Sequence, residues 1–168
     1  MGHILLLIFL FNLVHGNEVI VSEKENDCPE HWLDAGSVGM GCIWINQTLA
    51  MSWYNANTYC QYKEATLVEI HTPEQLEYLR MELSTMEEYI GPADYWTGGT
   101  DIGREGKWIW ISSLTEVEEF VWYTSEPNQG YAANCLQLWS AADYKGADNA
   151  CTDGEDHVGF YPICQKFT

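Results

Sequence analysis

Hydrophobic residues recur every three or four positions in two stretches of the chain, and this spacing predicts two helices. The first is expected from Ser52 to Tyr62, with Ser52 as its N-cap. One face of this helix collects Trp53, Ala56, Asn57 and Cys60. That face should pack against the rest of the domain, because it carries the apolar side chains of the segment.

The second helix has clearer start and stop signals. Thr72 fits the N-cap, Pro73 the first helical position, and Gln75 the third position of a capping box. The helix continues through Leu76, Leu79, Arg80 and Leu83. Gly91-Pro92 should end it, because glycine and proline in sequence interrupt helical hydrogen bonding.

The remaining apolar stretches are short and several alternate with polar residues, which predicts strands. They are Cys42–Ile45, Ala65–Ile70, Tyr95–Gly99, Trp108–Trp110, Leu136–Trp139 and Val158–Cys164. Two helices followed by many short strands favour a mixed α+β domain. The region from Asp94 to Ala150 is dominated by loops, and long loops in compact domains are usually functional.

The beginning of the chain differs from the rest. Residues 1–16 are expected to be a signal peptide cleaved after Gly16, because Ile4–Val14 is an apolar run too short to span a bilayer. The alternative is a buried N-terminal helix. Residues 17–27 are polar and acidic and predict a flexible lead-in, so the domain should occupy residues 28–168. No later stretch is apolar enough for a membrane span, and we expect a soluble, secreted, extracellular protein.

Cysteine usage agrees with secretion. All 6 cysteines follow the expected leader, and none forms a Cys-x-x-Cys pair of the kind that binds zinc or carries redox chemistry. An even number behind a signal peptide predicts three disulfides, although the sequence alone does not choose the pairing. Asn46 begins the sequon Asn46-Gln47-Thr48, so we expect it to be glycosylated and to lie at the surface.

Charge narrows the range of partners. The formal net charge is −18, from 25 acidic and 7 basic residues. Such a field repels nucleic acids and anionic surfaces, which excludes direct ion pairing with phosphate-rich polymers. Enzyme signatures are also missing: there is no Gly-x-Ser-x-Gly or His-Glu-x-x-His motif. We therefore expect a binding protein and not an enzyme.

The segment Glu126-Pro127-Asn128 carries the candidate chemistry. It holds a carboxylate and a carboxamide two residues apart, and both are hard-oxygen ligands of the kind that calcium prefers. A metal held there would leave coordination positions for the hydroxyl oxygens of a ligand. The alternative is a plain surface turn, because Pro-Asn is a common turn dipeptide.

The order of several anchor residues resembles a known family. The anchors are Cys28, Trp32, Cys42, Trp53, Ala56, Cys60, Trp96, Gly98, Gly99, Glu105, Gly106, Trp108, Trp110, Glu126-Pro127-Asn128, Cys135, Cys151 and Cys164. This order is similar to the C-type lectin domain in its long form, and the similarity runs from Cys28 to the end of the chain. It implies two helices packed on short, mostly antiparallel strands, with a long loop region.

The resemblance also implies specific contacts. The disulfides would be Cys28–Cys42, Cys60–Cys164 and Cys135–Cys151, and Trp96, Trp108 and Trp110 would be core residues. Calcium would sit in the loop region, with sugar hydroxyls completing its coordination. The Glu-Pro-Asn motif, with a cis proline, resembles the mannose-type selector. Glu126 would accept hydrogen bonds from hydroxyls and Asn128 would donate them, and Asp148 would complete the metal and carbohydrate site.

The chain departs from the family pattern at the calcium ligands. Ala133 stands where a glutamate is expected, and Ala147 stands where an asparagine is expected before Asp148. Calcium affinity should fall with the lost ligands. The candidates to substitute for the lost ligands are Asp143, Asn149, Asp153, Glu155 and Asp156. A second calcium site of the family retains Asp101 and Glu105 but has Gln129 and Asn134 in place of acids, so we expect that site to be empty.

These features predict a secreted, mannose-type carbohydrate-binding lectin with weakened calcium dependence, a soluble recognition protein of innate immunity. Its partner would be a carbohydrate or glycoconjugate, microbial ones included, and homo-oligomers would raise a weak affinity per site through avidity. The alternative is a calcium-independent C-type-lectin-like module that binds a protein or a mineral-like surface without sugar activity. The same fold supports both functions, so the fold alone does not decide between them.

Overall fold

The structure is a computed structural model that describes residues 28–152 and 160–167. The expected signal peptide (1–16) and lead-in (17–27) lie outside the described residues, as do three of the possible substitute ligands, Asp153, Glu155 and Asp156. Among the described residues, no helix is both long and apolar enough to cross a membrane.

Both expected helices form, with the caps that the sequence indicates. Helix α1 spans Trp53–Tyr62, and the side chain of Ser52 accepts a hydrogen bond from the backbone N–H of Asn55. Helix α2 spans Pro73–Ile90, and Thr72 caps it by accepting from the N–H of Gln75 at 3.3 Å. The return bond of the capping box is shifted, because the Gln75 side chain accepts from the N–H of His71 at 2.7 Å and not from that of Thr72.

The strands form one mixed sheet, in which β2 near the start of the domain pairs with β8 at its end. The strands are β1 Leu33–Asp34, β2 Cys42–Ile45, β3 Thr66–Leu67, β4 Tyr95–Thr100, β5 Ile109–Trp110, β6 Cys135–Trp139, β7 Lys145–Asn149 and β8 Tyr161–Lys166. The order along the sheet is β1-β2-β8-β4-β6-β7, with β3 beside β8 and β5 beside β4. Among these strands, only the pairing of β4 with β8 is parallel, so the sheet is mostly antiparallel and the expected α+β fold is confirmed.

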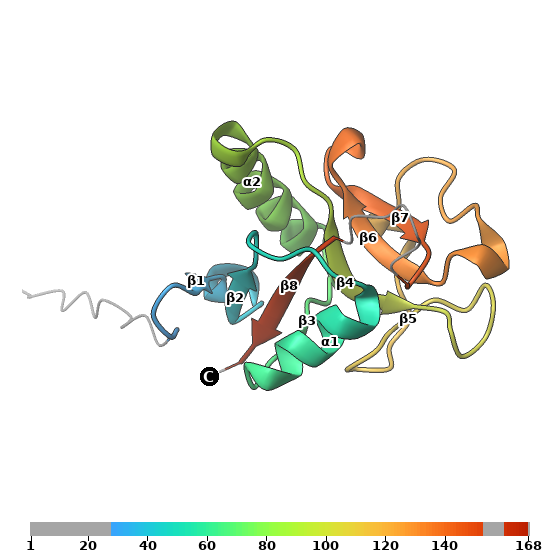
Figure 1. Cartoon of the computed structure of the whole chain (residues 1–168), viewed down its shortest axis with the longest axis horizontal. Coiled ribbons are helices and arrows are strands. Elements are labelled where there is room, and N and C mark those ends of the chain that lie inside the picture. Colours follow the sequence, from blue (N-terminus) through green and yellow to red (C-terminus); the bar gives the residue numbers. More distant parts are fainter. Residues whose placement is uncertain (1–27, 153–159, 168) are drawn as a thin grey trace, which may run out of the picture.

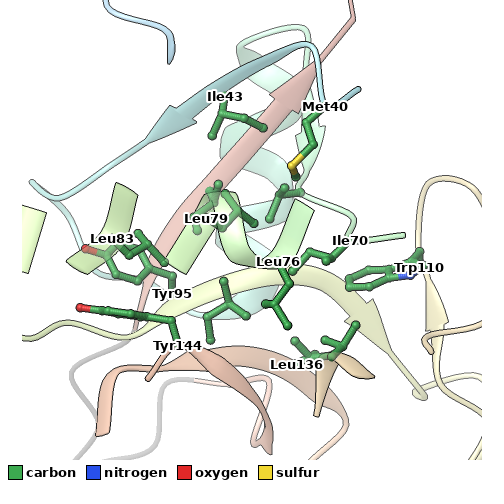
Figure 2. Close-up of a cluster of buried hydrophobic side chains, with 14 of the residues drawn as sticks. Met40, Ile43, Ile70, Leu76, Leu79, Leu83, Tyr95, Trp110, Leu136 and Tyr144 are labelled. Carbon is green, nitrogen blue, oxygen red and sulfur yellow. The ribbon is translucent and has the colours of Figure 1, made fainter. Parts of the chain in front are cut away.

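Figure 1 shows α1 and α2 on opposite sides of the strands, with the β1–β2 hairpin at one end and the long loops at the other. In the main core, Leu76, Leu79 and Leu83 of α2 point toward Leu136 and Tyr95 of the sheet (Figure 2). A second cluster lies between α1 and the sheet, where Trp53 and Trp96 pack beside two disulfides. The cores therefore hold the strands rigidly, and the loop region is built from their ends.

The disulfide pairing implied by the family resemblance is confirmed. The bonds are Cys28–Cys42, Cys60–Cys164 and Cys135–Cys151. The second one joins residues 104 apart in sequence and ties α1 to β8, which on a loop-entropy model contributes about 4–5 kcal/mol. Trp96, Trp108 and Trp110 are buried, with 2 %, 7 % and 0 % of their surface exposed, so they are core residues as expected.

Two expectations about local structure were wrong. The strand expected over Ala65–Ile70 is limited to Thr66–Leu67, because the N–H of Glu69 donates to the side chain of Gln165 at 3.0 Å and not to a backbone carbonyl. The buried carboxylate of Glu69 accepts from the backbone N–H groups of Ser112 and Ser113. Asn46 does not lie at the surface: it is 3 % exposed. Its carbonyl oxygen accepts from both the N–H and the hydroxyl of Thr48, so the sequon folds onto itself. Glycosylation at Asn46 stays a prediction, in conflict with this burial.

Candidate functional site

The loop that carries Glu126 is hydrogen-bonded to strand β7. A short 3-10 helix, Glu119–Val121, leads into it, and the N–H of Tyr123 donates to the carbonyl of Gly146 in β7 at 2.8 Å. The N–H of Glu126 then donates back to the carbonyl of Tyr123 at 3.0 Å, which closes a tight turn. The Glu126–Pro127 peptide bond is cis, as the resemblance implied. The turn therefore presents Glu126 and Asn128 on one side of Pro127.

The three residues predicted for the site are brought together. The side-chain amide of Asn128 donates to Oε1 of Glu126 at 2.8 Å. Asp148, on β7, is fully buried and lies beneath the loop. Its two carboxylate oxygens accept from the backbone N–H groups of Asn128, at 3.1 Å, and Gln129, at 2.8 Å. Asp148 thus fixes the position of the loop.

Gln129 adds a contact that sequence reasoning missed. Its side-chain amide donates to the backbone carbonyl of Asp148 at 2.7 Å, so every oxygen of Asp148 already accepts a hydrogen bond from the loop. The sequence placed Gln129 only as a lost acid of the second calcium site. Nothing in its spacing indicated that the amide turns back toward β7.

Glu126 and Asp148 perturb one another. Burial raises the pKa of Glu126 most, and the adjacent Asp148 raises it further, to about 7, while the hydrogen bond from Asn128 partly offsets this. The second carboxylate oxygen of Glu126, Oε2, is buried and has no hydrogen-bond partner among the described residues. Close to neutral pH, the loop therefore holds an acceptor that either a proton or a cation could satisfy.

A hollow of about 300 Å³ lies on the Asp148 side of Pro127. Asp101 and Glu105 line it together with Asp148, Asn128 and Ala133. Asp101 is 2 % exposed; its Oδ2 accepts from the N–H of Gly106, but its Oδ1 has no partner in the described chain, and neither does Oε2 of Glu105. Desolvation raises the pKa of Glu105, and the charges of Asp101 and Asp148 add to the effect.

These residues fit part of a calcium coordination shell. The unpartnered oxygens of Glu126, Asp101 and Glu105 are hard ligands of the type calcium takes. However, Ala133 and Ala147 are buried and supply no side-chain ligand. Within the described ranges, no group of three or more His, Cys, Asp or Glu side chains has an arrangement able to hold a metal ion. The shell is therefore short of the six to eight oxygens that calcium usually requires.

The described residues that might have replaced the lost ligands are engaged elsewhere. The carboxylate of Asp143 forms an ion pair with Arg80 of α2. The side chain of Asn149 accepts from the N–H of Ala150 at 2.7 Å and donates to Gln137 at 3.4 Å. Neither residue contributes to the site around Glu126.

Comparisons with known proteins agree with this geometry. The family model described as "Lectin C-type domain" matches residues 49–166. A perlucin-like protein of Mytilus galloprovincialis is 26 % identical over 161 residues, which cover 95 % of each chain. C-type lectin domain family 4 member M of Gorilla gorilla gorilla is 28 % identical over 84 % of this chain, but this chain spans only 34 % of that protein.

Solved structures show the same fold. The carbohydrate-recognition domain of cow CD23, solved in the presence of an oligosaccharide, superposes with a TM-score of 0.69 at 24 % identity, covering 85 % of this chain and 98 % of that one. A calcium-independent type II antifreeze protein superposes with a TM-score of 0.65 at 27 % identity, covering 83 % and 93 %. With the family model matching most of the chain and all three disulfides in place, the protein belongs to the C-type lectin domain family, whose members are generally binding proteins and not enzymes.

Proposed function

We propose that this protein is a carbohydrate-binding lectin of mannose type, in which Glu126 and Asn128 meet two neighbouring hydroxyl groups of a sugar. The observation that carries the proposal is the convergence of the two side chains beside the cis Pro127, where they are 2.8 Å apart. A carboxylate accepts from a hydroxyl and an amide donates to one. The pair therefore complements two adjacent hydroxyls that each donate and accept.

The chain's own residues do most of the positioning. Asp148 holds the backbone N–H groups of Asn128 and Gln129, so the loop is fixed before a ligand arrives. A preorganised loop loses little conformational entropy on binding. The sugar would replace the internal hydrogen bond between Asn128 and Glu126 with two bonds to its hydroxyls.

Calcium binding is weak in this proposal. When bound, a calcium ion would be held by Glu126, Asn128 and Asp148, and it would supply a Lewis-acidic contact to the two sugar hydroxyls. With Ala133 and Ala147 in place of ligands, the charge around it is reduced. Affinity should therefore lie at the weak end for extracellular modules, at roughly 10⁻⁴–10⁻³ M or weaker.

The biological setting is also part of the proposal. We infer that the protein is secreted and extracellular and serves as a soluble recognition protein of innate immunity for glycoconjugates, microbial ones included. Weak single sites gain apparent affinity when several are linked, so a homo-oligomer would suit this role.

Affinity chromatography on mannose-agarose tests the function. The mature chain should be retained in millimolar calcium and released by a chelator, and Asn128→Ala should pass through unretained. Asn134→Ala is a suitable control, because Asn134 lies in the same region but contacts the Tyr131 carbonyl and not Glu126. No retention of the wild-type chain, or retention that ignores the chelator, would contradict calcium-assisted mannose binding.

A second candidate function has its own support. All oxygens of Asp148 accept hydrogen bonds from the loop itself, so Asp148 needs no metal to satisfy it. A calcium-independent antifreeze protein shares the fold and 27 % of the sequence. In this version the domain binds a protein or a surface without calcium. Calorimetric titration distinguishes the two: a calcium dissociation constant tighter than about a millimolar would contradict the calcium-independent version.

A further inference from the structure

A second hollow, of about 410 Å³, adjoins the Asp148 pocket. It shares Gly106, Trp108 and Pro127 with that pocket, but its other walls are different. They are Glu116, Val117, Glu118, Glu119, Trp122 and Glu126. Its volume falls within the range of about 300–1,000 Å³ typical of small-molecule sites.

The charge of this hollow has one sign. Four glutamates line it, and no lysine, arginine or histidine does. Glu116, Glu118 and Glu119 are exposed. None of the four forms an ion pair within the described ranges, where Arg80 and two histidines make all such pairs. Arg104 and Lys107 belong to the neighbouring loop, but neither lines the hollow. No cationic side chain therefore lines the hollow or pairs with its carboxylates within the described ranges.

Two indole rings complete the wall. Trp108 and Trp122 pack edge to face, with ring centroids 4.8 Å apart at 76°. Trp122 is only partly buried, so part of its surface remains available to a ligand. Indole faces attract cations, and carboxylates add a separate electrostatic attraction. Paired rings and unpaired glutamates together complement a compact organic cation better than a neutral group.

The position of the hollow suggests which molecule carries that cation. Glu126 and Pro127 belong both to the hollow and to the proposed sugar-binding loop. A saccharide whose hydroxyls meet Glu126 and Asn128 would therefore have Trp122, Glu118 and Glu119 within reach of a neighbouring sugar residue. We propose that this hollow is a subsite for a positively charged amino group on the glycan, so that the protein prefers glycans containing free amino sugars.

The inference rests on the proposed sugar-binding function and adds the ligand class to it. Glucosamine offers the required test ligand, because its 3- and 4-hydroxyls are both equatorial, as they are in mannose. A substantial fraction of its amino groups carries a proton at pH 6.5, where the ring oxygens hold the amine pKa below the value near 8 of a peptide α-amino group. N-acetylation removes that charge while leaving the hydroxyls in place, which gives a matched ligand pair.

Isothermal titration calorimetry at pH 6.5 compares the β-1,4-linked glucosamine tetrasaccharide with its fully N-acetylated form. Both titrations use one calcium-containing buffer, because a nearby cation favours the ionised form of Glu126, whose pKa is otherwise about 7. The expected result is binding of the amino form about tenfold tighter, the size that a few screened charge contacts and a cation–π contact together provide. The Glu118→Gln/Glu119→Gln variant should reduce the preference to about twofold or less. The Glu30→Gln/Glu88→Gln variant changes the net charge by the same amount at two exposed residues that do not line the hollow, and it should retain the preference for the amino form.

The outcomes separate this inference from the function beneath it. Equal affinity for the two tetrasaccharides overturns the amino-sugar subsite and leaves the lectin proposal standing. A preference that survives the Glu118/Glu119 double substitution also overturns the subsite, because the attraction would then come from overall charge. Failure of both tetrasaccharides and mannose to bind overturns the subsite and the lectin function together. Tighter binding of a tetralysine peptide than of the amino tetrasaccharide overturns the glycan assignment in favour of a basic protein partner.

Discussion

Replacing Asp148 with asparagine tests whether this residue anchors the sugar-binding loop or serves only a metal. Asp148 is fully buried, and its carboxylate accepts from two backbone N–H groups at 3.1 and 2.8 Å. An asparagine would keep one acceptor oxygen but turn an NH₂ group toward the other N–H. The Asp148→Asn variant should therefore lose stability even in the absence of calcium.

The magnitude follows from the two contacts. A hydrogen bond to a charged group contributes about 1.5–3 kcal/mol, and the remaining bond would lose its charge assistance. We expect an overall loss of about 2–4 kcal/mol. For a domain of this size that corresponds to a fall in Tm of roughly 5–15 °C.

The pH dependence of this loss is a sharper check. The wild-type chain carries repulsion between Glu126 and Asp148 once Glu126 ionises, and Asp148→Asn removes that repulsion. The loss of stability should therefore be larger at pH 5, where Glu126 is protonated, than at pH 8. Burial would still hold the pKa of Glu126 above its ordinary value in the variant, but below about 7.

Thermal unfolding followed by tryptophan fluorescence, with disulfides intact and calcium removed, measures both effects. Asp34→Asn is the matched control, because Asp34 is exposed and accepts from one backbone N–H, that of Gly36. Its cost should stay below about 0.5 kcal/mol. If the Asp148 variant is as stable as the wild type without calcium, the residue does not anchor the loop and the reasoning fails.

Three further predictions concern other parts of the fold. Because the folded-state pKa of Glu126 is raised to about 7 from 4.5, metal-free stability should fall as pH rises from about 4.5 to 7. Glu126→Gln should flatten that part of the plot of Tm against pH, and an unchanged slope would refute the raised pKa of Glu126. Glu69→Gln should cost about 1.5–3 kcal/mol and speed hydrogen exchange of the Ser112 and Ser113 amides, because both N–H groups donate to the Glu69 carboxylate and would be left with a neutral amide oxygen as acceptor; unchanged exchange at both would contradict the role of Glu69. Gly39 and Gly41 both have positive φ, but only at Gly41 would a Cβ meet the Lys166 carbonyl oxygen, at 2.5 Å. In urea unfolding, Gly41→Ala should therefore lower stability by about 1–3 kcal/mol more than Gly39→Ala does. Equal unfolding midpoints for the two variants would contradict the close approach at Gly41.

The parts of the fold that the sequence predicted well are those set by local rules. Thr72, Pro73 and Gly91 fixed the limits of α2, because capping, proline placement and helix termination depend on neighbouring residues alone. The disulfide pairing came from the family resemblance and not from spacing. Short strands such as β3 were less predictable, because their length depends on which distant segment forms a hydrogen bond with each backbone N–H and carbonyl group.

The candidate site shows the same division. The positions of Glu126, Asn128 and Asp148 were predicted, and the structure brings them together. Their hydrogen bonding was not predicted, because the bonds from the amides of Asn128 and Gln129 to Asp148 depend on how the cis-proline loop lies against β7. The burial of Asn46 was missed for a related reason: a sequon is recognised by residue type, whereas its exposure is decided by packing against the last strands.

Titration of the ¹⁵N-labelled mature chain with methyl α-mannoside, followed by amide NMR, tests the central claim most directly. In millimolar calcium, the largest shifts should fall on the side-chain amide of Asn128 and the backbone amides of Asn128 and Gln129, and a chelator should reduce them. Asn46 and the surface of α2 should not move. Saturable shifts that cluster elsewhere, or no shifts at any accessible sugar concentration, would contradict the assignment of Glu126 and Asn128 as the sugar-binding pair.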